Sequence, residues 1–366
     1  MTARRIYLDQ THVRGHVTGI ERVALDLFSP DVLGDRDVRA VRSAGIAGMI
    51  VAQQVGLPWR AVRDRDAQFL MPGFPPGPLF APMRARCTLY VYDTFLLTRP
   101  QDLNWKSRLY MVPGFRLAMR WGRRFLAISR TTGEALRRVC AADAMVALLR
   151  PAVRDVFGLA GLPGPAACRP GEPLRMLAIG TIEPRKGYAA SVELAAALIR
   201  AGVPAELHIV GRVGWGRHAF LDDPPPFLTC HGYVDDAALR SLAARSHLLL
   251  STSRAEGLGL PLLEIQHGGL PVVAPQGAVF REVLGESGLL IRPDDPARAA
   301  ADVADWLRSG RYGASAAAAR GNVARWNGLA ERDAEYFRAY LDHGPSAYGP
   351  EHLIPVPSLA SKTSSP

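Results

Sequence analysis

Ser251-Thr-Ser-Arg-Ala-Glu-Gly-Leu-Gly-Leu-Pro-Leu-Leu-Glu264 is the most informative segment of this chain. The apolar run Leu248–Leu250 precedes it and predicts a buried strand that ends at small residues. Glycines after such a strand let backbone N–H groups approach a ligand closely and then begin a helix, whose N-terminus attracts an anion such as phosphate. One carboxylate, Glu256, lies in the predicted loop, and Glu264 lies about two turns away in the predicted helix. The segment therefore predicts a loop and helix start that bind a phosphate-bearing ligand.

The composition indicates a globular protein with an excess of positive charge. Of 366 residues, 48% are hydrophobic and 21% are charged, and the formal net charge is +10. This charge predicts a surface that attracts anions such as phosphates or acidic lipids, and no recognition motif favours nucleic acid. Only three of the 44 basic residues are lysines, so Lys186, which lies in a glycine-flanked loop, is more informative than any single arginine.

The cysteines and the hydropathy pattern predict a cytoplasmic protein. The four cysteines include no C-x-x-C pair, which argues against a disulfide framework or a zinc site. The N-terminus lacks the apolar region of a signal peptide, and no apolar stretch reaches the roughly 18–20 residues that span a bilayer. We expect a soluble protein, or one peripheral on the inner face of the cytoplasmic membrane.

Strands and helices alternate in two series, which predicts an α/β fold with two doubly wound parallel sheets and a cleft between them. The first domain is expected over 1–160 and the second over 161–325, joined by a Gly- and Pro-rich linker at 157–173. A helix over 326–342 is expected to return to the first domain. The Pro- and Ser-rich residues 343–366 are expected to form a flexible tail.

In the first domain, polar residues follow two predicted strands. A strand over Ile6–Leu8 ends at Asp9, and a later strand ends at Tyr92 and Asp93. Open α/β sheets bind ligands at such strand ends, so these residues are candidates for the acceptor side of a site. A turn or capping role is the alternative for Asp93. Gly19 is expected at the start of a helix, either as a ligand contact or as part of a plain N-cap and turn.

The segment Trp105–Arg124 interleaves aromatic and basic residues. Arg116, Arg120 and Arg123 fall at helical spacing on one face, which can rest on an anionic membrane surface. A solvated outer face with core aromatics is the alternative. Pro113-Gly114 is expected to interrupt the helix.

A second loop carries two adjacent cations. Gly180-Thr-Ile-Glu-Pro-Arg-Lys-Gly187 lies between a predicted strand and a predicted helix. Arg185 and Lys186 beside a helix N-terminus suit a diphosphate, including a diphosphate leaving group. The loop lacks the spacings of a P-loop and of a dinucleotide fingerprint, which argues against a kinase or a dehydrogenase.

Several motifs of the second half together resemble a known family. After the basic loop come, in order, Val210-Gly-Arg-Val-Gly-Trp215, His231-Gly-Tyr-Val-Asp235, the Glu256–Glu264 segment, Pro271-Val-Val-Ala274 and Glu282-Val-Leu-Gly-Glu-Ser-Gly-Leu-Leu-Ile-Arg-Pro-Asp294. The chain resembles the family 4 glycosyltransferases, which have the GT-B fold of two Rossmann-like domains. The likeness spans Ile6 to Tyr340 and is weaker in the first half, where Thr18-Gly-Ile-Glu-Arg22 is its best piece.

This resemblance implies a retaining transfer of a hexose from a nucleotide-diphospho-sugar, with no cofactor and no metal ion. The Glu-Pro-Arg-Lys form of the basic loop is similar to mannosyltransferases and favours GDP-mannose. The implied acceptor is a lipid-linked saccharide or a growing surface polysaccharide. A small soluble acceptor and a catalytically silent GT-B scaffold remain alternatives.

The resemblance also implies roles for individual residues. Glu256 would contact the donor sugar, and Lys186 and Arg185 would neutralise the diphosphate; these three are the expected catalytic residues. The implied donor-binding residues are Gly19, Gly180, Thr181, Gly257, Leu258, Gly259, Leu260 and Glu264, the last on the ribose. Two positions depart from the family pattern: Thr181 stands where many relatives have Arg, and Tyr92 where many have His.

Overall fold

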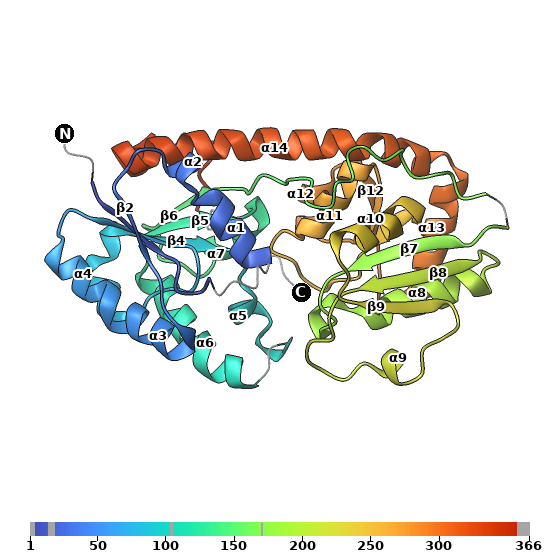
Figure 1. Ribbon diagram of the computed structural model, residues 1–366, viewed down its shortest axis with the longest axis horizontal. Helices are drawn as coiled ribbons and strands as arrows, with labels where there is room; N and C mark the ends of the chain where they lie inside the picture. The colour runs from blue at the N-terminus through green and yellow to red at the C-terminus, as the bar shows by residue number, and fades with distance from the viewer. Residues whose placement is uncertain (1–3, 14–18, 103–104, 170, 357–366) are drawn as a thin grey trace. The chain divides into compact units, whose positions relative to one another are not determined.

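The computed structural model describes residues 4–13, 19–102, 105–169 and 171–356. The chain divides into two compact units, which we describe separately. Unit 1 comprises Met1–Pro151 and Leu329–Pro366, and unit 2 comprises Ala152–Gly328. Each unit is built on one six-stranded sheet in which every strand pair is parallel (Figure 1). The predicted α/β fold with two doubly wound parallel sheets is confirmed.

The sheet of unit 1 has the strand order β2-β1-β3-β4-β5-β6. The order reverses between β1 and β3, which makes this the switch point of the sheet. Its strands are β1 (Ile6–Asp9), β2 (Val38–Val41), β3 (Gln68–Met71), β4 (Cys87–Val91), β5 (Arg124–Ala127) and β6 (Met145–Leu148). Its helices are α1 (Gly19–Leu27), α2 (Pro30–Leu33), α3 (Gly45–Val51), the π-helical η1 (Ala52–Gly56), α4 (Leu57–Arg63), η2 (Pro78–Arg86), α5 (Phe95–Thr98), η3 (Pro100–Asp102), α6 (Trp105–Trp121), α7 (Arg130–Arg137) and η6 (Pro345–Ala347).

The sheet of unit 2 has the order β12-β11-β10-β7-β8-β9, so its switch point lies between β7 and β10. Its strands are β7 (Leu174–Ile179), β8 (Ala205–Val210), β9 (Leu228–Gly232), β10 (Leu248–Leu250), β11 (Val272–Pro275) and β12 (Gly288–Ile291). Its helices are η4 (Pro184–Lys186), α8 (Tyr188–Arg200), α9 (Ala219–Asp222), α10 (Asp236–Arg245), α11 (Leu260–Glu264), η5 (Ile265–Gly268), α12 (Ala278–Leu284) and α13 (Pro296–Arg308). Helix α14 (Arg311–His343) contributes its first part to unit 2 and the residues from Leu329 onward to unit 1.

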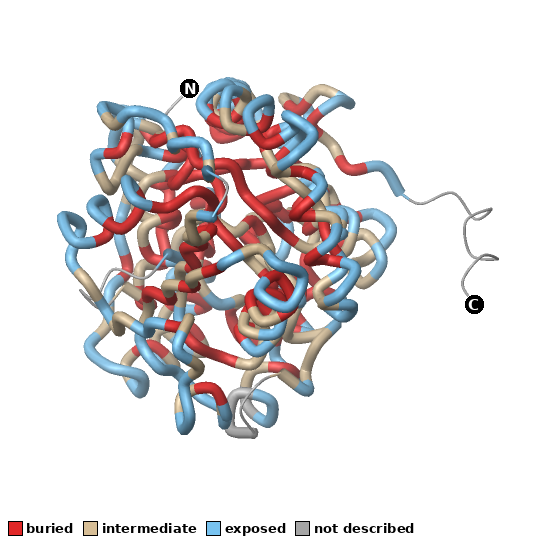
Figure 2. The backbone as a smooth tube through the Cα atoms, turned by 90° about the vertical axis from the view of Figure 1, so that its right-hand side faces the viewer, coloured by how far each residue is buried: buried red, intermediate tan, exposed pale blue. Residues whose placement is uncertain are grey.

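The strands form because their residues are almost continuously apolar, as expected for parallel strands covered on both faces. Every residue of β3, β4 and β10 is buried, and Figure 2 shows buried segments in the interior with exposed segments around the outside. The core of unit 1 contains Phe69, Phe80 and Phe125, and the core of unit 2 contains Trp306. These cores hold the carboxyl ends of the strands, and therefore the loops that follow them, in fixed positions.

The unit boundary differs from the expected one at 160/161 by nine residues, because the chain after Pro151 already packs on unit 2. The backbone of Val153 exchanges two hydrogen bonds with the amide of Asn327, at 2.7 and 3.0 Å. Leu159 is fully buried. At the other end the division falls at 328/329 rather than 325/326, inside α14.

The expected interruption at Pro113-Gly114 is wrong, since α6 runs unbroken from Trp105 to Trp121. Proline removes one backbone hydrogen bond, and the buried face of α6, with Phe115 and Ala118 in the core of unit 1, compensates for it. Arg123 lies beyond the helix and pairs with Asp143 at 2.8 Å, so the expected basic face comprises only Arg116 and Arg120, which are exposed.

The expectation of a flexible tail from residue 343 is wrong as far as residue 356. Ile354 is buried in the core of unit 1, and its N–H donates to the carbonyl of Val146 in β6 at 2.8 Å. Leu148 in turn donates to the carbonyl of His352 at 3.0 Å. Composition pointed to disorder, but β6 is an edge strand with unpaired backbone groups that the tail satisfies. Residues 357–366 lie outside the described residues.

Within the described part of the chain, no helix combines the length and the apolar character that crossing a membrane requires.

Candidate functional site

The candidate site lies at the switch point of the unit 2 sheet. The basic loop follows β7, and the Glu256–Glu264 segment follows the neighbouring strand β10. Because parallel strands end at the same edge of a sheet, the two loops meet although about 70 residues separate them in sequence. This is the edge at which doubly wound sheets bind their ligands.

Glycine allows the two loops to approach each other. Gly187 has φ 66°, and a Cβ at this position would lie 2.4 Å from the carbonyl oxygen of Thr252. The Thr252 hydroxyl donates to the Gly187 carbonyl at 2.8 Å, and the Tyr188 hydroxyl donates to the Gly180 carbonyl at 2.8 Å. Any other residue at 187 would force the loops apart.

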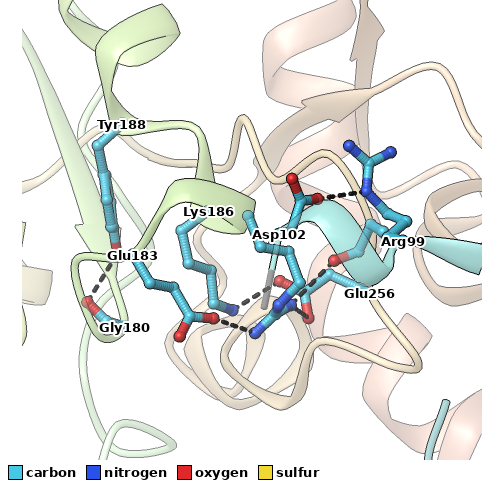
Figure 3. A network of polar contacts seen from close by, with 9 residues as sticks. Arg99, Asp102, Gly180, Glu183, Lys186, Tyr188 and Glu256 are labelled. Carbon is cyan, nitrogen blue, oxygen red and sulfur yellow. Dashed lines mark hydrogen bonds and ion pairs between the residues drawn. The ribbon is translucent and has the colours of Figure 1, made fainter. Parts of the chain in front are cut away.

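The three expected catalytic residues are brought together. The Lys186 ammonium contacts one carboxylate oxygen of Glu256 at 2.6 Å, and the Arg185 guanidinium contacts the other at 3.1 Å. Arg185 also donates to the carbonyl of Ala255 at 2.9 Å. Figure 3 shows Glu256 and Lys186 turned toward each other across the two loops. The Glu256 side chain is only 9% exposed, so this is a largely buried cluster of charges.

Glu183 completes the cluster and was missed by the sequence argument, which assigned it no role. Its carboxylate contacts the Arg185 guanidinium at 2.6 Å, and the residue is 5% exposed (Figure 3). The signal was present, since Glu183 stands in the same Glu-Pro-Arg-Lys motif as the two cations. Two carboxylates therefore balance two cations at the edge of the sheet.

The environment of Glu256 has opposing effects on its pKa. Burial of the carboxyl raises the pKa, but the charges of Lys186 and Arg185, together with a hydrogen bond from Lys186, outweigh this, so the pKa lies below its ordinary value of 4.5. The carboxylate is therefore ionised at neutral pH.

This pKa shift predicts how stability depends on pH. Since the folded-state pKa is lower than the unfolded-state value, the ionised Glu256 contributes stability above about pH 4.5, and this contribution is lost as the pH falls through the folded-state pKa. At pH 7, Glu256→Gln is expected to lower the free energy of unfolding by about 1–3 kcal/mol. Chemical denaturation between pH 7 and pH 3 measures the difference from the wild type, which should shrink as the pH falls.

The exposed Glu286→Gln is the control for the pH series, since it removes a carboxyl of unit 2 that lies outside the cluster. A Glu256→Gln deficit that stays constant over the whole pH range would contradict the assigned ion pairs.

Most of the remaining donor-side candidates lie around the start of α11, whereas Thr181 follows β7 and Gly19 begins α1 of unit 1. Gly259 has φ 79° and caps this helix, Leu260 is its first residue, and Glu264 is its last. Leu258 and Glu264 are each 3% exposed, and Thr181 is exposed. A small pocket beside the cluster, about 20 Å³ in volume, is lined by Lys186, Glu256 and Gly259 among others. The donor contacts expected of these residues stay predictions.

Among the described residues, no group of three or more His, Cys, Asp or Glu side chains is arranged to hold a metal ion. The expectation of catalysis without a metal stays a prediction.

The acceptor-side candidates lie in unit 1 and take part in its internal hydrogen bonds. Asp9 is fully buried, and its carboxylate accepts from the Thr11 hydroxyl at 2.6 Å and from the Gln53 amide at 3.0 Å. Asp93 accepts from the Phe95 N–H at 2.9 Å in the turn that leads into α5, which matches the turn role given as the alternative. The Tyr92 hydroxyl donates to the Ile20 carbonyl at 3.2 Å. Gly19 is the first residue of α1. Their roles toward a ligand stay predictions.

Comparison with known families and curated proteins finds similarity over part of the chain. Residues 173–309 match the family described as glycosyl transferases group 1. A serotype-specific mannosyltransferase, WbdA, of Escherichia coli is 34% identical over 135 residues, which are 35% of this chain and 17% of WbdA. The O-antigen chain mannosyltransferase B of Escherichia coli is 33% identical over 127 residues, which are 32% of this chain and 33% of that protein. The matches thus span a sixth to a third of these relatives.

Comparison with solved structures covers nearly the whole chain. HepE of Anabaena, in complex with UDP and glucose, has a TM-score of 0.63 at 16% identity, over 92% of this chain and 99% of that one. WaaG, described as a glycosyltransferase involved in lipopolysaccharide biosynthesis, has a TM-score of 0.65 at 15% identity, over 90% of this chain and 98% of that one. At such low identity these likenesses establish the fold alone. Residues 173–309 are therefore a group 1 glycosyltransferase domain, within a chain of the two-unit GT-B fold.

Proposed function

We propose that the chain is a retaining glycosyltransferase that transfers a hexose from a nucleotide-diphospho-sugar to a saccharide acceptor in polysaccharide biosynthesis. The observation that carries this proposal is the cluster of Lys186, Arg185 and Glu256 at the switch point of the unit 2 sheet. A diphosphate needs cations at such an edge, and a sugar needs a hydrogen-bond acceptor beside them.

The two cations stabilise the charge that develops as the diphosphate leaves. Lys186 and Arg185 stand before α8, whose N-terminal N–H groups add a partial positive charge. Their positions are fixed in advance by Glu183 and Glu256, so little reorganisation accompanies the bond cleavage. The bond from the anomeric carbon to the diphosphate oxygen breaks, and the acceptor hydroxyl forms a new bond on the same face. Its proton passes to the departing phosphate oxygen.

The glutamates orient the donor rather than acting as general bases. Glu256 is held ionised by two cations, and its oxygens can accept hydrogen bonds from the hydroxyls of the donor sugar. Glu264 is buried at the end of α11. The family motif implies that this residue contacts the ribose of the donor. The backbone N–H groups around Leu258 and Gly259 complete the donor site.

We propose mannose as the sugar, GDP-mannose as the donor, and a lipid-linked saccharide or a growing surface polysaccharide as the acceptor. The similarity of about a third of this chain to the two Escherichia coli mannosyltransferases supports this choice. The net charge of +10 suits both an anionic donor and an anionic lipid carrier.

A donor screen tests the proposal. Purified protein is expected to bind GDP-mannose more tightly than UDP- or dTDP-sugars and to hydrolyse it slowly when no acceptor is present. Calorimetry and the release of free nucleotide measure the two properties. Turnover of a UDP-sugar would replace the donor and keep the reaction class. If the protein binds no donor and turns over none, the enzyme proposal fails and the protein is a non-catalytic GT-B scaffold.

A further inference from the structure

Unit 1 contains a large pocket that none of the donor-side cluster residues lines. Its volume is about 850 Å³, within the range of about 300–1,000 Å³ typical of ligand sites. One wall is formed by α3, with Met49 and Ile50, and by η1; another is formed by α6, with Met111 and Phe115. Loop residues 74–78 close it from a third side.

The pocket lies at the switch point of the unit 1 sheet. His12 follows β1, and the loop that begins at Phe74 follows β3, the neighbouring strand across the switch point. Such points are where open α/β sheets bind ligands. The loop passes close to η1, since a Cβ on Gly77 would lie 1.6 Å from the side-chain amide oxygen of Gln54.

The lining of this pocket is mostly apolar and includes three polar residues. His12, Gln53 and Gln54 are the polar residues, and Gln53 is itself bonded to Asp9 at the end of β1. The apolar remainder suits a hydrocarbon chain, and the three polar side chains suit a head group. The lining therefore fits an amphiphile better than a free sugar.

The surface beside the pocket points to a membrane as the source of this amphiphile. We call the five residues of this surface, all between 55% and 63% exposed, the apolar stripe: Ile46, Val51, Val55, Trp59 and Val62. They recur every three to five residues along α3, η1 and α4, which places them along one side of a helical segment. Ile46 belongs to the stripe and also lines the pocket, so the two are continuous. Arg60 and Arg63 at the end of the stripe suit anionic head groups.

We propose that the unit 1 pocket binds the hydrocarbon chain of an anionic membrane lipid, the lipid that carries the saccharide acceptor. The identity of this lipid as the acceptor rests on the proposed function. The stripe lies on the bilayer, and the chain enters the pocket from there with its head group at the three polar side chains.

A series of prenyl phosphates of increasing length tests the pocket directly. Affinities of isopentenyl, geranyl and farnesyl phosphate for the full chain are measured by calorimetry, without any donor. Burying one additional methylene raises the affinity about fourfold. Each added isoprene unit is therefore expected to raise the affinity at least about tenfold until the pocket is full. An affinity that does not depend on chain length, or that inorganic phosphate matches, would mean a head-group site only and overturn the proposal.

Gly114→Leu blocks the pocket without removing any contact. Gly114 lies inside α6 and lines the pocket, and a Cβ there meets no atom within 4 Å. Leucine also has the higher helix propensity, so the variant is expected to fold. Farnesyl phosphate affinity should fall at least about tenfold.

Gly313→Leu, which adds the same side chain at an open, exposed position of α14, should leave the affinity unchanged. Equal affinity in the two leucine variants would refute the assignment. Leu117→Gln, at a 44% exposed lining position, repeats the test by lowering the apolar character of the wall.

The stripe is tested separately with vesicles. Val55→Asp combined with Val62→Asp should reduce capture of a long prenyl phosphate from anionic vesicles at least about tenfold, while binding of geranyl phosphate from solution stays unchanged. Equal capture by this variant and the wild type would overturn the membrane as the source of the ligand.

Failure of the lipid site and failure of the proposed function give different results. Wild-type protein that hydrolyses a nucleotide-sugar but binds no prenyl phosphate refutes the lipid site and keeps the function. Binding of the prenyl series by a protein that turns over no nucleotide-sugar refutes the function and supports the lipid site.

Discussion

Lys186→Met is expected to lower kcat/KM for nucleotide-sugar consumption about 100- to 1,000-fold, the loss typical when one preorganised group that stabilises a transition-state charge is removed. The ammonium is held at 2.6 Å from Glu256 and stands just before the N-terminus of α8. Methionine keeps most of the length of the side chain and removes its charge. Single-turnover release of nucleotide, measured with the donor that the screen identifies, gives the rate of the affected step.

Loss of fold must be separated from loss of charge. Glu256 keeps its contact with Arg185 in this variant, so the structure should survive, which thermal denaturation measures. Arg308→Met removes an exposed cation of unit 2 from α13 and should leave turnover unchanged. Turnover within threefold of the wild type in Lys186→Met would remove this lysine from the site.

The second half of the chain was readable from sequence because its signals are local. A strand, a glycine and a helix start follow one another within ten residues around Gly180 and again around Gly257. The ends of such elements are set by short-range chemistry, and parallel pairing then brings the two loops together. The sequence alone therefore predicts that Arg185, Lys186 and Glu256 belong to one site.

The pairing inside the site could not be predicted in the same way. That Arg185 contacts both Glu183 and Glu256 depends on side-chain rotamers and on the distance between two loops. Sequence spacing does not contain either quantity. A carboxylate two positions before a cation is as often a solvated neighbour as a partner, so Glu183 had no assigned role.

The failed expectations in unit 1 share one cause, which is that tertiary contacts override local propensity. Pro113 disfavours a helix, but the buried face of α6 outweighs it. The tail composition disfavours order, but the free edge of β6 binds it. The apolar pocket was also invisible, because its walls come from segments near residues 12, 50, 75 and 115 that only the fold assembles.

Asp333→Ala is expected to lower the free energy of unfolding of unit 1 by about 3–5 kcal/mol, because it leaves a buried charge without its partner. Asp333 on α14 is fully buried and accepts from the Arg150 guanidinium at 2.7 and 2.9 Å and from the Arg150 N–H at 2.9 Å. His352 of the docked tail lies 3.3 Å from the same carboxylate. One side chain thus ties the end of β6, the helix and the tail together. The midpoint of thermal unfolding should fall by roughly 10 °C.

Two further variants test whether burial, rather than the ion pair as such, sets this cost. Arg150→Met combined with Asp333→Leu removes both charges and should restore much of the lost stability, since no unpaired charge remains. Asp305 pairs with Arg311 at a similar distance of 2.6 Å, but both side chains are more than half exposed. Asp305→Ala should therefore cost at most about 1 kcal/mol. If the Asp305 and Asp333 variants lose equal stability, the buried carboxylate does not hold unit 1 together. The expected result is a large loss of stability in Asp333→Ala that the double variant restores, and it identifies the buried, unpaired charge of Arg150 as the cause.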